Sequence, residues 1–163
     1  MPKTLLLMRH AKSSWKTEAI SDKERPLNKR GQRAANQMAD FLKDRNLIPS
    51  IVLSSTAVRA EMTSRLLLEK WNNAVDLELF DSLYHAPPNA YLDAIASCIS
   101  THQNVLCVGH NPGLEELVLM LSGKHEFMST AAIAMFTTAH EWNRIDRNHF
   151  ELIDVFRPKE IDS

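Results

Sequence analysis

Short apolar runs alternate with segments of helical periodicity along most of the chain, and this alternation constrains the fold most. Thr4 to Met8, Ser50 to Ser54 and Asn104 to Gly109 are typical of strands buried on both faces. Parallel neighbouring strands need crossover connections, which are usually helices. The order therefore predicts an α/β fold with three layers, in which helices cover both faces of a mostly parallel central sheet.

The other elements complete this pattern. Four segments have helical periodicity and candidate caps: Asn28 to about Arg45, Ser55 or Thr56 to about Trp71, Asn89 to Ser100, and Leu114 to Leu121 ending near Gly123. Three further runs are typical of strands: Val75 to Phe80 as an edge strand, and Ala132 to Thr138 with Phe150 to Phe156 as a hairpin. The polar stretch from Ala11 to Leu27 is predicted to be a long loop.

Length and charge limit the classes of function. The 163 residues suit one domain over 1–163, and the formal net charge of −1 gives no overall attraction to nucleic acid or to an anionic membrane. The longest apolar runs fall far short of the roughly 20 residues that span a bilayer. The N-terminus has no secretory pattern, which predicts a cytoplasmic protein. Cys98 and Cys107 stand in apolar surroundings and are predicted to be small hydrophobic residues rather than a disulfide or metal pair.

Polar residues follow three of the predicted strands where each strand ends. Arg9 and His10 follow the first strand, Arg59 lies in the helical turn after the second, and His110 follows Gly109. Ligands of such sheets bind beyond the carboxyl ends of the strands, so we expect these side chains to share one pocket. Arg59 stands in the first turn of its helix, where the macrodipole disfavours a cation, and such a locally unfavourable choice is typical of functional residues.

The residue types in this cluster favour a phosphate or another oxyanion as the ligand. The histidines lack the spacing of metal ligands, and Arg9 and Arg59 would repel a dication, so no metal is predicted. The glycines are too scattered for a nucleotide-binding loop, so no cofactor is predicted either. Guanidinium groups bind phosphoryl groups in a bidentate manner, and Gly113 after Pro112 would let backbone amides at the helix start join them.

These motifs resemble the histidine phosphatase superfamily, whose fold is phosphoglycerate mutase-like. Three segments match its motifs in order: Leu7 to Lys12 with the Arg-His signature, Ser54-Ser55 followed by Arg59-Ala60-x-x-Thr63, and Val108 to Asn111. Arg25-Pro26-Leu27, Leu83-Tyr84-His85-Ala86 and the short length are similar to the small phosphohistidine phosphatases of the SixA type.

The resemblance implies roles for individual residues. His10 would attack phosphorus and carry the phosphoryl group, while Arg9, Arg59 and His110 hold its oxygens. It also implies a substrate-binding set made of Ser13, Arg25, Asn111 and Gly113. Many relatives place a glutamate acid in the loop after the third strand, whereas this loop reads Phe80 to His85 and offers Asp81 or His85 as the possible general acid.

Three functions are compatible with these residues. The first is hydrolysis of phosphohistidine in a phosphorylated protein, and the second is hydrolysis of small phosphate monoesters. The third is a non-catalytic module that binds phosphoproteins, which would have no need of His10 beside the arginines. An imidazole leaving group can take its proton from solvent, so the absence of an assigned acid favours phosphohistidine.

Overall fold

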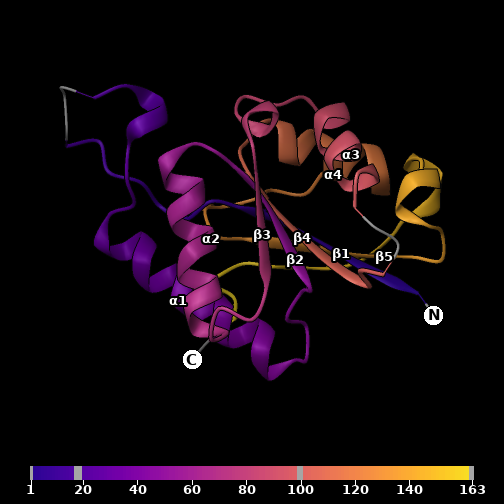
Figure 1. The fold of residues 1–163 in the computed structure, drawn as a ribbon. Helices are drawn as coiled ribbons and strands as arrows, with labels where there is room; N and C mark the ends of the chain where they lie inside the picture. The colour runs from indigo at the N-terminus through magenta and orange to yellow at the C-terminus, as the bar shows by residue number, and fades with distance from the viewer. Residues whose placement is uncertain (1, 17–19, 99–100, 162–163) are drawn as a thin grey trace.

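A computed structural model describes residues 2–16, 20–98 and 101–161, and its centre is one six-stranded sheet (Figure 1). The strands are β1 (Lys3–Arg9), β2 (Ile51–Ser55), β3 (Asp76–Phe80), β4 (Asn104–Gly109), β5 (Ile133–Thr138) and β6 (Glu151–Phe156). Their order is β3-β2-β4-β1-β5-β6, and the first four are parallel. β5 runs antiparallel to both β1 and β6. The mostly parallel sheet, the edge position of β3 and the final antiparallel pair are therefore confirmed.

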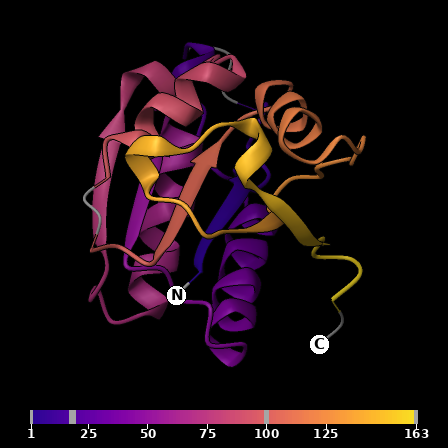
Figure 2. The same cartoon turned by 90° about the vertical axis from the view of Figure 1, so that its right-hand side faces the viewer.

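In the described part of the chain, four α-helices cover the two faces of this sheet. They are α1 (Lys29–Asp44), α2 (Val58–Lys70), α3 (Pro88–Ala96) and α4 (Gly113–Ser122). In Figure 1, α3 and α4 lie on one face while α1 and α2 lie on the other, and Figure 2 shows β6, in yellow, at the outer edge. The three-layer α/β architecture is thus confirmed.

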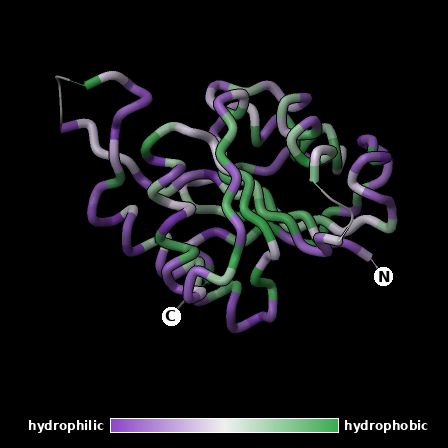
Figure 3. The backbone as a smooth tube through the Cα atoms, in the orientation of Figure 1, coloured by the Kyte–Doolittle hydropathy of each residue, from purple (hydrophilic) through white to green (hydrophobic). Residues whose placement is uncertain are grey.

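The side chains of β1 alternate between two hydrophobic cores. Leu5 and Leu7 pack with α3 and α4, whereas Leu6 and Met8 pack with α1 and α2. Figure 3 shows the central strands in green and most of the surrounding loops in purple. Within the described residues, no helix combines the length and apolar character needed to cross a membrane.

Several predicted boundaries need correction. α2 begins at Val58 with Ala57 at its N-cap, because Ser55 still belongs to β2 and its Oγ accepts a hydrogen bond from the Ala57 amide. α3 ends at Ala96, and the predicted helix end at 99–100 lies outside the described residues. The Asn28 N-cap is confirmed, since its side chain accepts from Gly31 N at 2.8 Å.

The two cysteine thiols are free. Cys107 is fully buried in β4, and Cys98 is partly buried beyond α3. Burial raises the pKa of the Cys98 thiol to about 11, so it stays protonated at neutral pH. Both residues behave as the sequence predicted, as small hydrophobic side chains.

Candidate functional site

A pocket of about 540 Å³ lies beyond the carboxyl ends of β1, β2 and β4, and we call it the strand-end pocket. The structure brings Arg9, His10, Arg59 and His110 together there, as the sequence led us to expect. The described residues that line it are Arg9, His10, Lys12, Ser13, Trp15, Asp22, Arg25, Arg59, His85, His110, Asn111, Phe127, Ser129 and Thr130.

The His10 ring is held in one tautomer. Its Nδ1 lies 2.7 Å from the Ala11 carbonyl oxygen, which can only accept, so Nδ1 carries the proton. The lone pair is therefore on Nε2, toward which Arg59 Nε donates at 3.4 Å. The Ala11 amide donates to Thr63 Oγ1 at 3.0 Å, which fixes the backbone that holds the ring. The structure thus presents an unprotonated ring nitrogen to the pocket.

His10 and His110 are neutral at neutral pH. Burial, reinforced by the cations of Arg59, Arg9 and Arg25, lowers the pKa of His10 to about 4. Burial and the neighbouring His10 and Arg59 lower the pKa of His110 to about 3. A neutral imidazole is the form that can act as a nucleophile.

His110 and Arg9 have polar atoms that no described residue satisfies. His110 Nε2 lies 2.8 Å from Ser55 Oγ, but its Nδ1 is buried without a hydrogen-bond partner among the described residues. Arg9 donates from Nη1 to the Met128 carbonyl at 3.1 Å, while its Nε is likewise unpartnered within the described ranges. Buried polar atoms of this kind are rare, and here they border a pocket that can admit an oxyanion.

Arg25 and Ser13 form a second polar unit of the pocket. Arg25 Nη1 donates to Ser13 Oγ at 2.7 Å, and the Arg25 guanidinium lies 3.6 Å from the centre of the Trp15 ring. Trp15 is 77% exposed and forms part of the rim. The loop that carries these residues thus adds a third arginine to the pocket.

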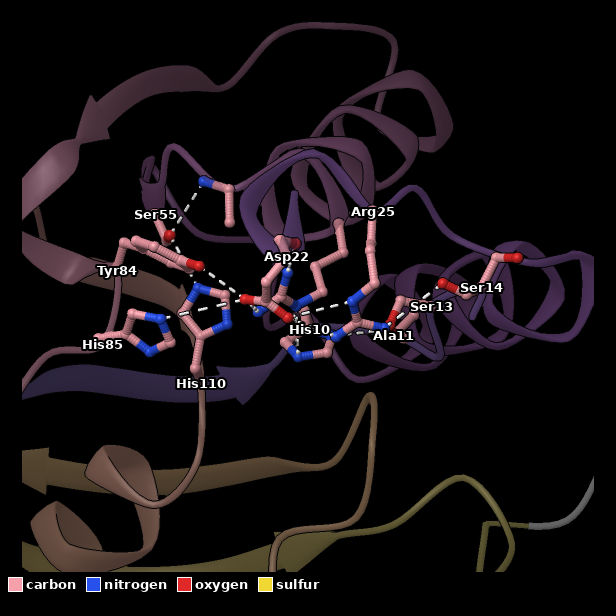
Figure 4. Close-up of polar contacts among 12 residues, drawn as sticks. His10, Ala11, Ser13, Ser14, Asp22, Arg25, Ser55, Tyr84, His85 and His110 are labelled. Atoms are coloured by element: carbon pink, nitrogen blue, oxygen red, sulfur yellow. Dashed lines mark hydrogen bonds and ion pairs between the residues drawn. The ribbon is translucent and has the colours of Figure 1, made fainter. Parts of the chain in front are cut away.

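The sequence reasoning missed Asp22, which lies in the arginine cluster (Figure 4). Its Oδ2 accepts from Tyr84 Oη at 2.6 Å and from Arg59 Nη2 at 3.1 Å, and its Oδ1 accepts from Arg25 Nε at 3.1 Å. The Tyr84 hydrogen bond, together with Arg59 and Arg25, holds the pKa of this carboxyl well below its usual range. Asp22 is therefore an ionised carboxylate in the pocket, and it repels an anion that binds there.

A local signal for Asp22 does exist in the sequence. Ser21 and Glu24 form a capping box around the short helical turn Asp22–Glu24, and this turn directs Asp22 inward. Tyr84 stands beside His85 in a segment that the sequence had linked only to family resemblance. Neither position has a periodic pattern that would have indicated a shared site.

The two candidate acids have different positions. Asp81 does not line the strand-end pocket, because its carboxylate accepts from Thr56 Oγ1 at 2.6 Å and pairs with Lys23 at 3.5 Å. His85 does line the pocket, with Nε2 4.0 Å from Asp22 Oδ2 and an exposed side chain. Of the two, His85 alone is in a position to reach a bound group.

Asn111 and Gly113 also differ in position. Asn111 lines the pocket, and its Nδ2 donates to the Met128 carbonyl and to Glu115, which ties the loop before β5 to α4. Gly113 lines a neighbouring hollow of about 270 Å³ instead. A Cβ there would lie 2.1 Å from the Ala86 carbonyl oxygen, so a close backbone approach requires this glycine.

The arrangement suits attack on an electrophile that carries negative charge. Three guanidinium groups line the same pocket as the unprotonated Nε2 of His10, and that of Arg59 lies beside it, so an anionic group would be held close to that nitrogen. In the described part of the chain, no group of three or more His, Cys, Asp or Glu side chains is arranged to hold a metal ion.

Comparisons with known proteins agree with this geometry. Residues 5–84 match the model of the histidine phosphatase superfamily (branch 1). A structure from Agrobacterium tumefaciens, assigned as phosphohistidine phosphatase SixA, is 30% identical with a TM-score of 0.82, covering 97% of this chain and 99% of that one. One from Nakamurella multipartitia with the same assignment is 25% identical with a TM-score of 0.85, covering 97% of each chain. An uncharacterised chloroplastic protein of Arabidopsis thaliana is 31% identical over 80% of this chain, which spans 64% of that protein.

Proposed function

Because this chain belongs to the histidine phosphatase superfamily and to its SixA-type branch, we propose that it hydrolyses phosphohistidine in proteins through a phosphorylated His10. The observation that carries the proposal is the unprotonated Nε2 of a neutral, buried His10 with the Arg59 guanidinium beside it. Phosphoryl transfer depends mainly on positioning and on neutralising charge, and this pocket supplies both.

The proposed reaction has two steps. His10 Nε2 attacks phosphorus, the bond from phosphorus to the substrate imidazole breaks, and that imidazole takes a proton from solvent. Water then attacks the phosphorus on His10 and releases orthophosphate, which restores the neutral ring. Arg9, Arg59 and His110 would hold the phosphoryl oxygens through both steps, and Arg25 would add positive charge at the same pocket.

The protonation state of the pocket supports an imidazole leaving group. Among the described residues, the carboxyl that lines the pocket is that of Asp22, which is ionised and cannot donate a proton in this state. An alkoxide leaving group needs such a proton, and a positioned acid typically contributes about 10²–10⁴-fold. We therefore expect kcat/KM for a phosphohistidine protein to exceed that for phosphoserine peptides and sugar phosphates by at least about 10²-fold.

A side-by-side dephosphorylation assay tests the substrate class. The three substrates and an aryl phosphate are assayed with the native protein, and intact-protein mass spectrometry looks for an acid-labile phosphoryl group on His10. His140→Ala is the matched control, because His140 is exposed and lies away from the pocket. It follows the end of β5, which pairs with the start of β1, whereas the pocket lies at the end of β1. Equal efficiency on all three substrates would reject the proposal and would direct attention to His85 as an acid.

The arginine-rich pocket also supports catalysis without a metal. We expect exhaustive chelation to leave turnover unchanged and tungstate or vanadate to inhibit by occupying the phosphoryl position. Activity that disappears with chelator and returns with a divalent ion would contradict this. The cytoplasmic location and the single-domain organisation of residues 1–163 stay predictions.

A further inference from the structure

A second concavity opens beside the strand-end pocket, and we call it the basic groove. It has a volume of about 690 Å³ and is lined by Lys12, Arg30, Arg33, Ala34, Gln37, Phe127, Ser129, Thr130, Arg157, Pro158, Lys159 and Glu160. Lys12, Phe127, Ser129 and Thr130 line both concavities. The groove therefore continues from the place where a phosphoryl group would be bound.

The walls of the basic groove are held together by specific contacts. Gln37 Nε2, on α1, donates to the carbonyls of Pro158 at 3.2 Å and Ile161 at 3.1 Å, so the chain after β6 returns beside α1 (Figure 1). Arg157 Nε donates to the Phe127 carbonyl at 2.9 Å, and its guanidinium pairs with Glu126 at 3.0 Å. These contacts hold the walls of the basic groove in place, so the groove is a defined feature of the fold.

The helix is also fixed against the loop that follows His10. A Cβ on Gly31 would lie 2.1 Å from the Lys12 carbonyl oxygen, so α1 and this loop approach as closely as their backbones allow. The same carbonyl accepts from the Asn28 amide at 3.0 Å. The basic groove therefore has a fixed position relative to His10.

Four cations along the groove have no anionic partner among the residues that the structure describes. In the part of the chain that the structure describes, no carboxylate oxygen lies within 4.0 Å of the side-chain nitrogens of Lys12, Arg30, Arg33 or Lys159. Arg157, by contrast, is paired with Glu126 and Glu160. The whole chain has a net charge of only −1, so this excess of positive charge is local.

We propose that the basic groove binds an acidic polypeptide segment next to the phosphohistidine of the substrate protein, an inference that rests on the proposed function. A ligand that fills the groove while its phosphoryl group reaches His10 must extend through both concavities, which suits a chain molecule. Phe127, 62% exposed on the shared wall, offers an apolar contact of the kind that protein partners use. Exposed cations of this kind speed the association of an acidic partner and disfavour basic partners.

The test compares phosphohistidine peptides that differ only in the flanking segment, a run of glutamates against an equal run of glutamines. We expect the glutamate peptide to have a KM about tenfold lower at low salt. Arg33→Glu/Lys159→Glu should abolish that difference and leave turnover of an aryl phosphate unchanged. Lys43→Glu/Lys124→Glu, with the same change in net charge and with neither residue in the groove or the pocket, should keep it.

A direct binding measurement separates this proposal from the proposed function. A fluorescent glutamate peptide without phosphate should bind the native protein and lose binding in Arg33→Glu/Lys159→Glu. Binding together with failure to hydrolyse any phosphohistidine peptide would defeat the proposed function and leave the groove assignment standing. Equal binding of the glutamate and glutamine peptides, binding retained in the double variant, or tighter groove-dependent binding of an RNA oligonucleotide would each overturn the proposal.

Discussion

The strand-end pocket and the basic groove both gather cations, but they hold these cations differently. In the pocket, Arg59 is 5% exposed and donates to both His10 and Asp22. In the groove, Arg30 and Arg33 are exposed on α1 and have no carboxylate partner within the described residues. Burial and hydrogen bonds fix the orientation of the pocket arginine. The exposed groove arginines can rotate and remain hydrated.

This difference indicates a division of labour between the two regions. Fixed charges in a dehydrated site stabilise a transition state without reorganising, so they act on the chemical step. Solvated charges contribute little to a fixed geometry but attract a charged partner, and salt screens that attraction. We therefore expect variants of the pocket to change kcat and variants of the groove to change KM for protein substrates.

The sharpest test of the pocket is His10→Ala, which removes the nucleophile. We expect turnover of every phosphorylated substrate to fall by at least about 10³-fold, because the covalent route is lost. The groove should remain intact, so binding of the glutamate peptide should be unchanged. Steady-state kinetics with thermal unfolding as the folding check measures this, and substantial residual turnover would reject His10 as the nucleophile.

The next test compares one arginine from each region. Arg59→Met should lower kcat for an aryl phosphate by about 10²- to 10³-fold, since it removes a fixed cation from the phosphoryl oxygens. Arg33→Met should leave that kcat unchanged, because Arg33 does not line the pocket. A loss of kcat below about tenfold for Arg59→Met would mean that Arg59 does not stabilise the transition state. An equal loss of kcat in both variants would mean that the pocket and the groove do not differ in their effect on the chemical step.

A smaller effect is expected at Asp22, the anion within the pocket. Asp22→Asn removes a negative charge that accepts from Arg59 and Arg25, so inorganic phosphate should bind about tenfold more tightly. Product inhibition measures this, with Glu24→Gln as the control in the same turn. Unchanged inhibition in Asp22→Asn would mean that the carboxylate and the phosphate do not compete.

The last test concerns pH. With a pKa of about 4, His10 should stay neutral down to about pH 5, and NMR of the ring nitrogens can follow it. An unfolded histidine takes up its proton near pH 6.5, so the free energy of unfolding should decline as the pH falls from about 6.5 toward about 4. Peptide binding in the groove should hold down to about pH 5.5, since lysine and arginine stay charged, and should weaken below that as the glutamates of the peptide are protonated near their ordinary pKa of about 4.3. A His10 titration near 6.5 would contradict the burial argument.

The sequence predicted the strand ends better than the loops. Arg9, His10 and His110 each follow a buried apolar run, and the topology of a parallel sheet brings such positions to one edge. Asp22 and Tyr84 lie in segments without periodicity, so the contact between their side chains is visible only in the folded chain. The choice of Asp81 as an acid came from its place in the chain, but a hydrogen bond to Thr56 holds it away from the pocket.

The basic groove could not be predicted for the same reason. Arg30 and Arg33 are an ordinary exposed pair on α1, and only the return of the chain to Gln37 places Lys159 near them.

Helix boundaries are harder to predict than strand positions. Ser55 and Thr56 have the chemistry of N-caps, but the strand continues through Ser55.

The central place of β1 has a consequence for how the protein opens. This strand is hydrogen-bonded on both sides, to β4 and β5, and Leu5 through Met8 are fully buried. Edge strands β3 and β6 have one neighbour each and several exposed side chains, so their amide hydrogens should exchange with solvent through local fraying. We expect the amides of β1 to exchange only when the whole domain unfolds. Arg9 and His10 are therefore anchored to the part of the molecule that opens last.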